Sequence, residues 1–140
     1  MAVKLLDDSE LKALELELRT YRQFKVNMAT IMLNKEWKEP DENSWITSSR
    51  GHNEKALDDI IFKESNPAYQ INLLKSIAVD KTMEKLSDEL RQIVEKYMWG
   101  EYSYLPWREV AEKEFVSKST IYDWRYKILE TYAYETGKLV

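Results

Sequence analysis

The side chains best suited to molecular recognition lie close together near the C-terminus, within residues 107–128. On a helix there, one polar side would carry an ammonium group, hydroxyl groups and a carboxylate, from Lys118, Ser119, Tyr122, Asp123 and Tyr126. Such groups form hydrogen bonds with base edges and with phosphate oxygens. If the chain recognises DNA, we expect these residues to do it.

Two predicted helices must hold this polar side in place. Their apolar residues recur at the spacing of a short helix, a turn and a second helix, namely Val110, Ala111, Val116, Ile121 and Trp124. This spacing lets two helices cross steeply over one small core, so residues 107–128 predict a helix-turn-helix. Ser117 is a suitable N-cap for the second helix, because its hydroxyl can accept from a free backbone N–H.

The turn of this predicted helix pair is unusual. It contains Glu114 and Phe115 where a leucine–glycine pair is usual, and a phenylalanine has no easy access to positive φ. Either the turn adopts another shape, or its backbone is strained. Phe115 could also fill the core in place of the missing leucine.

The composition limits the class of protein. With 140 residues, 44% of them hydrophobic and 33% charged, the chain can bury one core, or form a small domain with a helical extension. No apolar run reaches the roughly 20 residues of a membrane span, and we find no signal-peptide core. The absence of cysteine excludes disulfides, thiol catalysis and cysteine-based zinc sites. We therefore expect no membrane partner and a cytoplasmic location.

The net charge of −4 is unfavourable for a DNA-binding protein, because neutralised phosphates supply much of the affinity of such complexes. The predicted recognition helix differs from the rest of the chain. Residues 118–129 carry Lys118, Arg125 and Lys127 against Asp123, which gives a local charge of +2. We expect weak DNA affinity from a single copy.

Apolar spacing along the rest of the chain predicts helices and no confident strand, so the expected fold class is all-α. An amphipathic helix over residues 1–33 is followed by a linker or long loop over residues 34–53, which contains Pro40 and Gly51. Residues 54–140 then form a helical domain that ends in the helix-turn-helix. Helix ends within this domain are marked by Asn66, Ser87, Gly100 and Gly137.

The N-terminal helix has an apolar stripe at three- and four-residue steps, made of Leu11, Leu14, Leu18, Tyr21 and Met28. This stripe predicts either a helix docked on its own domain or one that pairs with a second copy or a partner. Lys25 interrupts it and fewer than four heptads are present, so a coiled coil is not predicted.

Nothing in the sequence supports an enzyme. The single histidine, His52, has no second histidine with which to hold a metal. The motifs GxGxxG, GxxxxGK[ST], GxSxG and HExxH are absent. Acidic pairs such as Asp58-Asp59 fit a solvated helix face better than a catalytic site, because neighbouring side chains point in different directions. We expect no catalytic residue, no metal and no cofactor.

Several aromatic residues between 97 and 107 could stack single-stranded bases, namely Tyr97, Trp99, Tyr102, Tyr104 and Trp107. That use requires basic neighbours, and only Arg108 is near, beside Glu101 and Glu109. A packed corner between helices is therefore the favoured interpretation.

Residues 85–129 resemble the C-terminal region of sigma factors (region 4), which binds promoter DNA. More of the chain is similar to the RinA/ArpU-like activators of phage late transcription. Residues 14–25 match an ELRTYRQFK-like N-terminal helix, residues 37–53 match a variable stretch with Trp and Pro, and residues 86–134 match a sigma-like helix-turn-helix.

The resemblance implies a phage transcription regulator that acts in the bacterial host cell. It would bind double-stranded DNA near a promoter and activate late packaging or structural genes with host RNA polymerase. By matching positions, the residues that face DNA would be Ser117, Lys118, Ser119, Thr120, Tyr122, Asp123 and Tyr126, with Arg125 and Lys127 toward phosphates. A homo-oligomer formed through the N-terminal helix would compensate for weak binding by pairing half-sites.

Two other functions remain open. A phage packaging adaptor, such as a small terminase-like subunit, also carries a helix-turn-helix, but usually ahead of the oligomerisation helices and not behind them. A protein-interaction module whose acidic surface repels DNA would bind no duplex at all.

Overall fold

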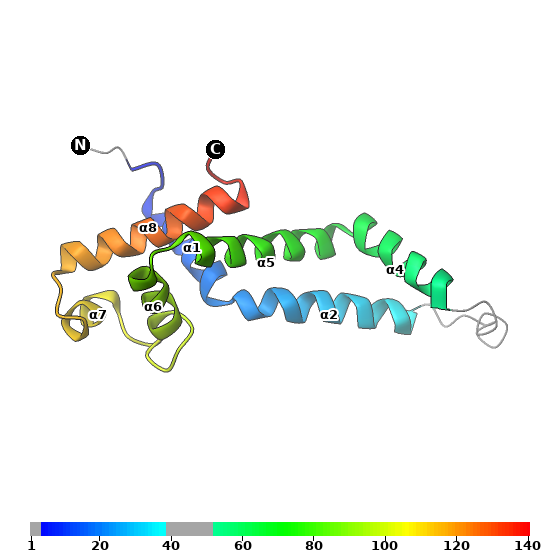
Figure 1. Cartoon of the computed structure of the whole chain (residues 1–140), viewed down its shortest axis with the longest axis horizontal. Coiled ribbons are helices and arrows are strands. Elements are labelled where there is room, and N and C mark those ends of the chain that lie inside the picture. The colour runs from blue at the N-terminus through cyan, green and yellow to red at the C-terminus, as the bar shows by residue number, and fades with distance from the viewer. Residues whose placement is uncertain (1–3, 39–51) are drawn as a thin grey trace. The chain divides into compact units, whose positions relative to one another are not determined.

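The computed structural model describes residues 4–38 and 52–140. Within these ranges the chain forms helices and no strand, which confirms the expected all-α class (Figure 1). The helices are α1 (Asp8–Arg19), α2 (Tyr21–Lys38), α4 (His52–Ser65), α5 (Pro67–Lys85), α6 (Asp88–Tyr97), α7 (Trp107–Lys113) and α8 (Lys118–Thr136). None of the helices in this described part is long and apolar enough to cross a membrane.

The helices belong to two compact units. The first unit combines Met1–Tyr21 with Ile77–Val140, so it contains α1, the end of α5, and α6, α7 and α8. The second unit is Arg22–Ser76, which holds α4, almost all of α2 and the first half of α5. This division differs from the expected boundaries after residues 33 and 53. Helix α1 packs on α8 and so belongs with the C-terminal helices, whereas Arg22–Ser76 extends across the expected boundary at residue 53.

The expected linker lies mostly outside the described residues. Helix α2 continues to Lys38, and α4 already begins at His52, so both ends of the segment 34–53 are helical. Residues 39–51, which join these two helices, are outside the described part of the chain.

The N-terminal helix is interrupted at Thr20, although its apolar stripe predicts one continuous helix. Thr20 leaves the helical conformation (φ −100°, ψ 24°), and its hydroxyl donates to the carbonyl of Leu16 at 2.7 Å. Beyond the break, the ring of Tyr21 packs against Trp99 with the centroids 4.4 Å apart. Tertiary packing therefore ends α1 without a glycine or proline.

The core of the first unit is built around α8, on which both α1 and α7 pack. Burial of one aliphatic side chain in such a core contributes about 1.5–3 kcal/mol. The spacing of apolar residues at three and four positions explains why each helix turns one side inward. Buried side chains come from α1 (Leu11, Leu14, Leu18), α6 (Leu90, Ile93, Val94, Tyr97), α7 (Trp107, Val110, Ala111) and α8 (Ile121, Ile128, Leu129, Tyr132, Ala133).

Several helix ends follow the residue types that predict them. The side chain of Asn66 accepts from the N–H of Tyr69 at 2.9 Å, directly before Pro67 begins α5. Ser87 caps α6 in the same way. Gly137 ends α8 with φ 82°, in the left-handed region that favours glycine. These predicted ends are confirmed.

Phe115 occupies the left-handed region, with φ 58°, in the turn between α7 and α8. Its side chain is 95% exposed, so the expectation that it fills the core is wrong. The alternative expectation, a strained backbone, agrees with the structure. A residue with a side chain held in this region is destabilised by about 1 kcal/mol or more relative to a favoured conformation.

We expect Phe115→Gly to raise the free energy of unfolding by about 1 kcal/mol, because glycine reaches this φ without a steric penalty. Phe115→Ala is the matched control, since it removes the exposed ring and keeps the strained backbone. It should change stability by less than about 0.5 kcal/mol. Urea denaturation measures both variants, and an equal gain from alanine would show that the backbone is not the cause.

Candidate nucleic-acid interface

The expected recognition residues lie on α8 and on the residue before it. Of the nine, the exposed ones are Ser117, Lys118, Ser119, Tyr122, Asp123 and Lys127. The partly exposed ones are Thr120, Arg125 and Tyr126. Positions 118, 119, 122 and 123 share one side of the helix, while Ile121 faces the core with no exposed surface. Helix α8 therefore presents a polar row to solvent over its first two turns.

Ser117 sets the start of α8. Its hydroxyl oxygen accepts from the backbone N–H of Thr120 at 3.1 Å and lies 2.9 Å from the hydroxyl of Thr120. The cap leaves other N–H groups of the first turn unpaired within the helix, and they carry partial positive charge. This end of α8 is thus suited to an anionic group such as a phosphate.

Arg125 lies apart from this polar row. Its Nε donates to Oε1 of Glu15 at 2.6 Å, and its side chain is 15% exposed. This placement contradicts the expectation that Arg125 points toward DNA phosphates, because its charge is already paired inside the first unit.

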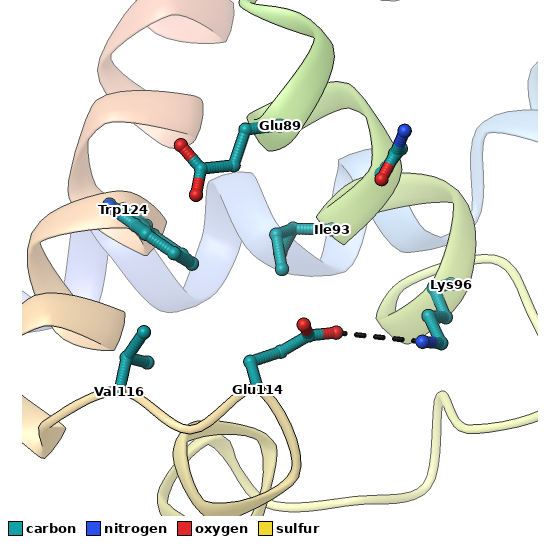
Figure 2. A pocket seen from close by; sticks show the side chains of 7 residues that line it. Glu89, Ile93, Lys96, Glu114, Val116 and Trp124 are labelled. Atoms are coloured by element: carbon teal, nitrogen blue, oxygen red, sulfur yellow. Dashed lines mark ion pairs between the residues drawn. The ribbon is translucent and has the colours of Figure 1, made fainter.

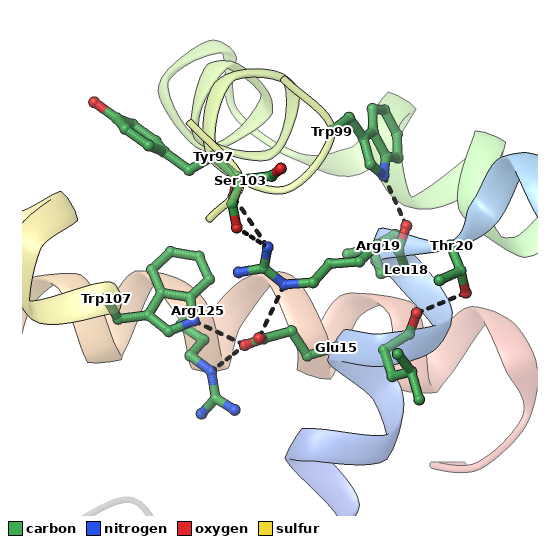
Figure 3. Close-up of polar contacts among 10 residues, drawn as sticks. Glu15, Leu18, Arg19, Thr20, Tyr97, Trp99, Ser103, Trp107 and Arg125 are labelled. Atoms are coloured by element: carbon green, nitrogen blue, oxygen red, sulfur yellow. Dashed lines mark hydrogen bonds and ion pairs between the residues drawn. The ribbon is translucent and has the colours of Figure 1, made fainter. Parts of the chain in front are cut away.

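Glu15, on α1, has contacts with both α7 and α8 (Figure 3). Its Oε1 also accepts from the indole N–H of Trp107 at 2.8 Å, and its Oε2 accepts from Nε of Arg19 at 3.0 Å. We call Glu15, Arg19, Trp107 and Arg125 the Glu15 cluster. Arg19 in turn donates to the carbonyl of Ser103 at 2.8 Å, so the cluster also holds the chain that leads into α7.

The cluster determines the charge state of Glu15. Burial by itself would raise the pKa of this carboxyl. Hydrogen bonds from Arg125 and Trp107, together with the charges of Arg125 and Arg19, outweigh burial and lower the pKa below its usual value. Glu15 is therefore held as a carboxylate.

Tyr126 is also engaged within the protein. Its hydroxyl oxygen accepts from the backbone N–H of Leu5 at 2.9 Å, and the ammonium group of Lys4 lies 5.4 Å from the centre of its ring. The N-terminal segment thus already contacts both the hydroxyl and the ring of Tyr126.

The turn before α8 is tied to α6. The carboxylate of Glu114 accepts from the hydroxyl of Tyr97 and forms an ion pair with Lys96 at 3.6 Å. Burial and the neighbouring Glu114 carboxylate raise the pKa of Tyr97, so the phenol keeps its proton. Glu114, the unusual residue of the turn, thus anchors the turn to α6.

A cleft of about 240 Å³ lies beside this anchor (Figure 2). It is lined by Glu89, Gln92, Ile93, Lys96, Glu114, Val116 and Trp124. The apolar spacing places Trp124 in the core, but its ring forms part of the cleft wall and is partly exposed. Of the two apolar residues expected to face the core from this part of α8, Ile121 is fully buried and Trp124 is not.

The aromatic stretch before α7 is largely packed. Tyr97 and Trp107 are buried, and the indole N–H of Trp99 donates to the carbonyl of Leu18 at 2.7 Å. Tyr104 is the exception, at 75% exposed. This arrangement agrees with a helix corner and not with a platform for single-stranded bases.

The described residues contain no group of three or more side chains that could hold a metal ion. Comparison of the chain with protein-family models, with curated proteins and with solved structures finds no match.

Sequence reasoning missed the Glu15 cluster. The only local signal is the spacing of Glu15 and Arg19, four residues apart beside the leucine stripe of α1. Arg125 and Trp107 carry no signal that links them to α1, because the contacts are made only after the helices pack.

We expect Arg125→Ala to lower the free energy of unfolding by about 2 kcal/mol, since it leaves the partly buried Glu15 with a weaker set of partners. Lys127→Ala is the control, because Lys127 is exposed on the same helix and should lose less than about 0.5 kcal/mol. Urea denaturation of both variants gives the comparison. Similar losses would show that the ion pair with Glu15 does not stabilise the fold.

The lowered pKa of Glu15 gives a pH dependence with a definite sign. A carboxyl whose pKa is lower in the folded state stabilises the protein above its unfolded pKa and loses this contribution as the pH falls through the folded pKa. We expect Glu15→Gln to be less stable than wild type near neutral pH, and the difference to shrink in acid below about pH 4. Unfolding free energies measured across this range test it, and a constant difference would argue against an ionised Glu15.

Proposed function

We propose that the chain is a DNA-binding transcription regulator that uses α8 as its recognition helix. The observation that carries this proposal is the exposed polar row on the first two turns of α8, formed by Lys118, Ser119, Tyr122 and Asp123. Helix α7 packs on α8, and Ile121 of α8 is fully buried. A helix supported in this way can enter a major groove with its N-terminal residues against base edges.

The proposed contacts divide into base readout and phosphate binding. Tyr122 and Asp123 would read base edges, and a carboxylate can accept from cytosine N4. Lys118 and Lys127 would bind phosphates, together with the N-terminus of α8. Arg108, exposed on α7, would add a phosphate contact in place of Arg125.

The number of cations at the proposed interface determines how strongly DNA binding should depend on salt concentration. Three phosphate contacts predict that log K falls with log salt concentration with a slope of about −3. This is a weak salt dependence for a DNA-binding protein. Arg125 is not counted, because its charge is paired with Glu15.

The resemblance to RinA/ArpU-like activators supports a more specific role. We propose that the protein binds near late phage promoters in the bacterial cytoplasm and activates transcription with host RNA polymerase. The net charge of the chain, −4, opposes DNA binding, so the proposed contact is restricted to one limited surface.

Lys118→Gln should weaken binding to duplexes of any sequence and make the salt slope shallower by about 1, because one phosphate contact is lost. Lys81→Gln is the matched control, since it makes the same charge change at an exposed position of α5. Gel shifts at several salt concentrations on mixed-sequence duplex measure both. The proposal fails if wild type retains no duplex at low salt, or if the two variants behave alike.

Tyr122→Ala should reduce sequence preference more than overall affinity, because the ring is assigned to base edges. The test compares a duplex enriched by the wild-type protein from a random library with a scrambled duplex of the same composition. We expect the ratio of the two affinities to fall by about tenfold or more, as for loss of one base contact. An unchanged ratio would remove Tyr122 from the reading surface.

A further inference from the structure

Helix α4 packs on α2 through a side that carries charged residues. Nζ of Lys35, on α2, lies 2.9 Å from Oδ1 of Asp59 and 5.3 Å from the centre of the Phe62 ring. Lys55 pairs with Glu36 at 3.7 Å. The Lys35 contact lowers the pKa of Asp59, so this carboxylate stays charged in the contact.

The apolar side of α4 points the other way. Leu57, Ile60 and Ile61, spaced by three and four residues, are 56%, 51% and 54% exposed. A helix on the surface of a self-contained domain places such a stripe against its own core. In α4 the arrangement is reversed, with charge toward α2 and aliphatic side chains toward solvent.

Helix α2 carries a second exposed stripe. Its other side faces α5, where the side-chain amide of Asn27 donates to that of Asn72 at 3.0 Å. Val26 and Leu33 are 53% and 55% exposed, and Arg22 and Ala29 are exposed on the same side of the helix. This stripe of α2 is therefore apolar with a basic residue at one end.

The second unit has little core of its own. Among its described residues, Phe24 is the buried hydrophobic side chain, whereas Ile71 and Leu74 on α5 are also more than half exposed. Small units that bury so little apolar surface are marginally stable without a partner. Covering the exposed stripes would therefore stabilise this unit.

We propose that a second copy of this chain covers these stripes, with α4 of each copy packed on the α2 stripe of the other. Leu57, Ile60 and Ile61 would pack between Val26 and Leu33 of the partner copy. The inference does not depend on DNA binding.

The area agrees with a dimer. If the five half-exposed aliphatic side chains of the two stripes are covered, on the order of 400 Å² of apolar surface is removed per copy. Interfaces are a little over half apolar, so this corresponds to about 700 Å² of polar and apolar surface per copy. A standard interface buries about 800 Å² per partner.

Charge favours a second copy over a membrane or a nucleic acid. Helix α4 carries four acidic residues and two lysines, so it would be repelled by anionic lipids and by phosphates. Asp58 and Glu64 are exposed beside the apolar stripe of α4, and Arg22 is exposed at the end of the α2 stripe. Pairing α4 with α2 of another copy brings these opposite charges together.

The first test is the mass in solution by sedimentation equilibrium, from low micromolar to near-millimolar concentration. We expect the wild-type chain at twice 16.7 kDa and Ile60→Asp at 16.7 kDa. Leu16→Asp is the matched control, because Leu16 is 64% exposed on α1, in the first unit, and should leave the dimer intact. A wild-type monomer at every concentration, or a dimer that persists in Ile60→Asp, overturns the proposal. So does a wild-type monomer that binds neutral lipid vesicles, which would assign the surface to a membrane.

A second measurement keeps the proposal testable if Ile60→Asp loses its fold. The chain has no cysteine, so single-cysteine variants carry one thiol each. An equimolar mixture of Ile60→Cys and Ala29→Cys should form a disulfide between the two copies on mild oxidation. A mixture of Leu16→Cys and Ala29→Cys should not. Equal cross-linking in both mixtures, or none in either, contradicts the proposed pairing.

Discussion

The ionised carboxylate of Glu15 is the interaction on which the first unit depends. Burial disfavours its charge, and two guanidinium groups with an indole N–H more than compensate for that penalty. Arg125 and Trp107 belong to α8 and α7, and Arg19 extends the network to the carbonyl before α7, so one side chain of α1 fixes both helices of the proposed recognition element. A helix as short as α7 forms few internal hydrogen bonds and needs such contacts to stay in place. The same pairing takes one positive charge away from the surface of α8. In the proposed function, the ion pair with Glu15 would therefore compete with phosphates for Arg125.

The sequence was sufficient to predict the helices and helix ends that depend on neighbouring residues. The apolar spacing from Leu90 to Ile128 predicts α6, α7 and α8, and Asn66, Ser87 and Gly137 mark helix ends through their own side chains or backbone freedom. The sequence was insufficient to predict features that depend on a contact between residues far apart in the chain. Arg125 and Glu15 are separated by 110 positions. The position of Arg125 on the polar side of its predicted helix therefore could not reveal that its charge is paired. The end of α1 at Thr20 depends in the same way on Tyr21 meeting Trp99. The apolar stripe on its own extends through that position, and only tertiary packing divides it.

The turn between α7 and α8 illustrates how two unusual residues can compensate for each other. Phe115 is held at positive φ, a conformation that its side chain disfavours. Glu114, immediately before it, accepts from the Tyr97 hydroxyl and pairs with Lys96, and both partners belong to α6. The contacts to α6 hold the turn in a shape that the sequence of the turn does not favour. The turn between α7 and α8 thus depends on contacts with a helix outside the pair, which the sequence of the turn alone does not reveal.

The proposed DNA-binding surface has few positive charges, and the second unit has exposed apolar stripes. These two features have a common consequence. In the proposed complex a single copy would use three cations, Lys118 and Lys127 on α8 and Arg108 on α7. It would gain little from counterion release, and its affinity would fall only about tenfold to a hundredfold over a fourfold rise in salt. Two copies held together would make six phosphate contacts, and the slope of log K against log salt would approach −5. The second helix would then bind at a high effective concentration, which strengthens binding without any new contact between α8 and DNA. An acidic chain can in this way bind DNA usefully while most of its surface repels it. Specificity would come from the spacing of two half-sites as much as from the bases that Tyr122 and Asp123 touch.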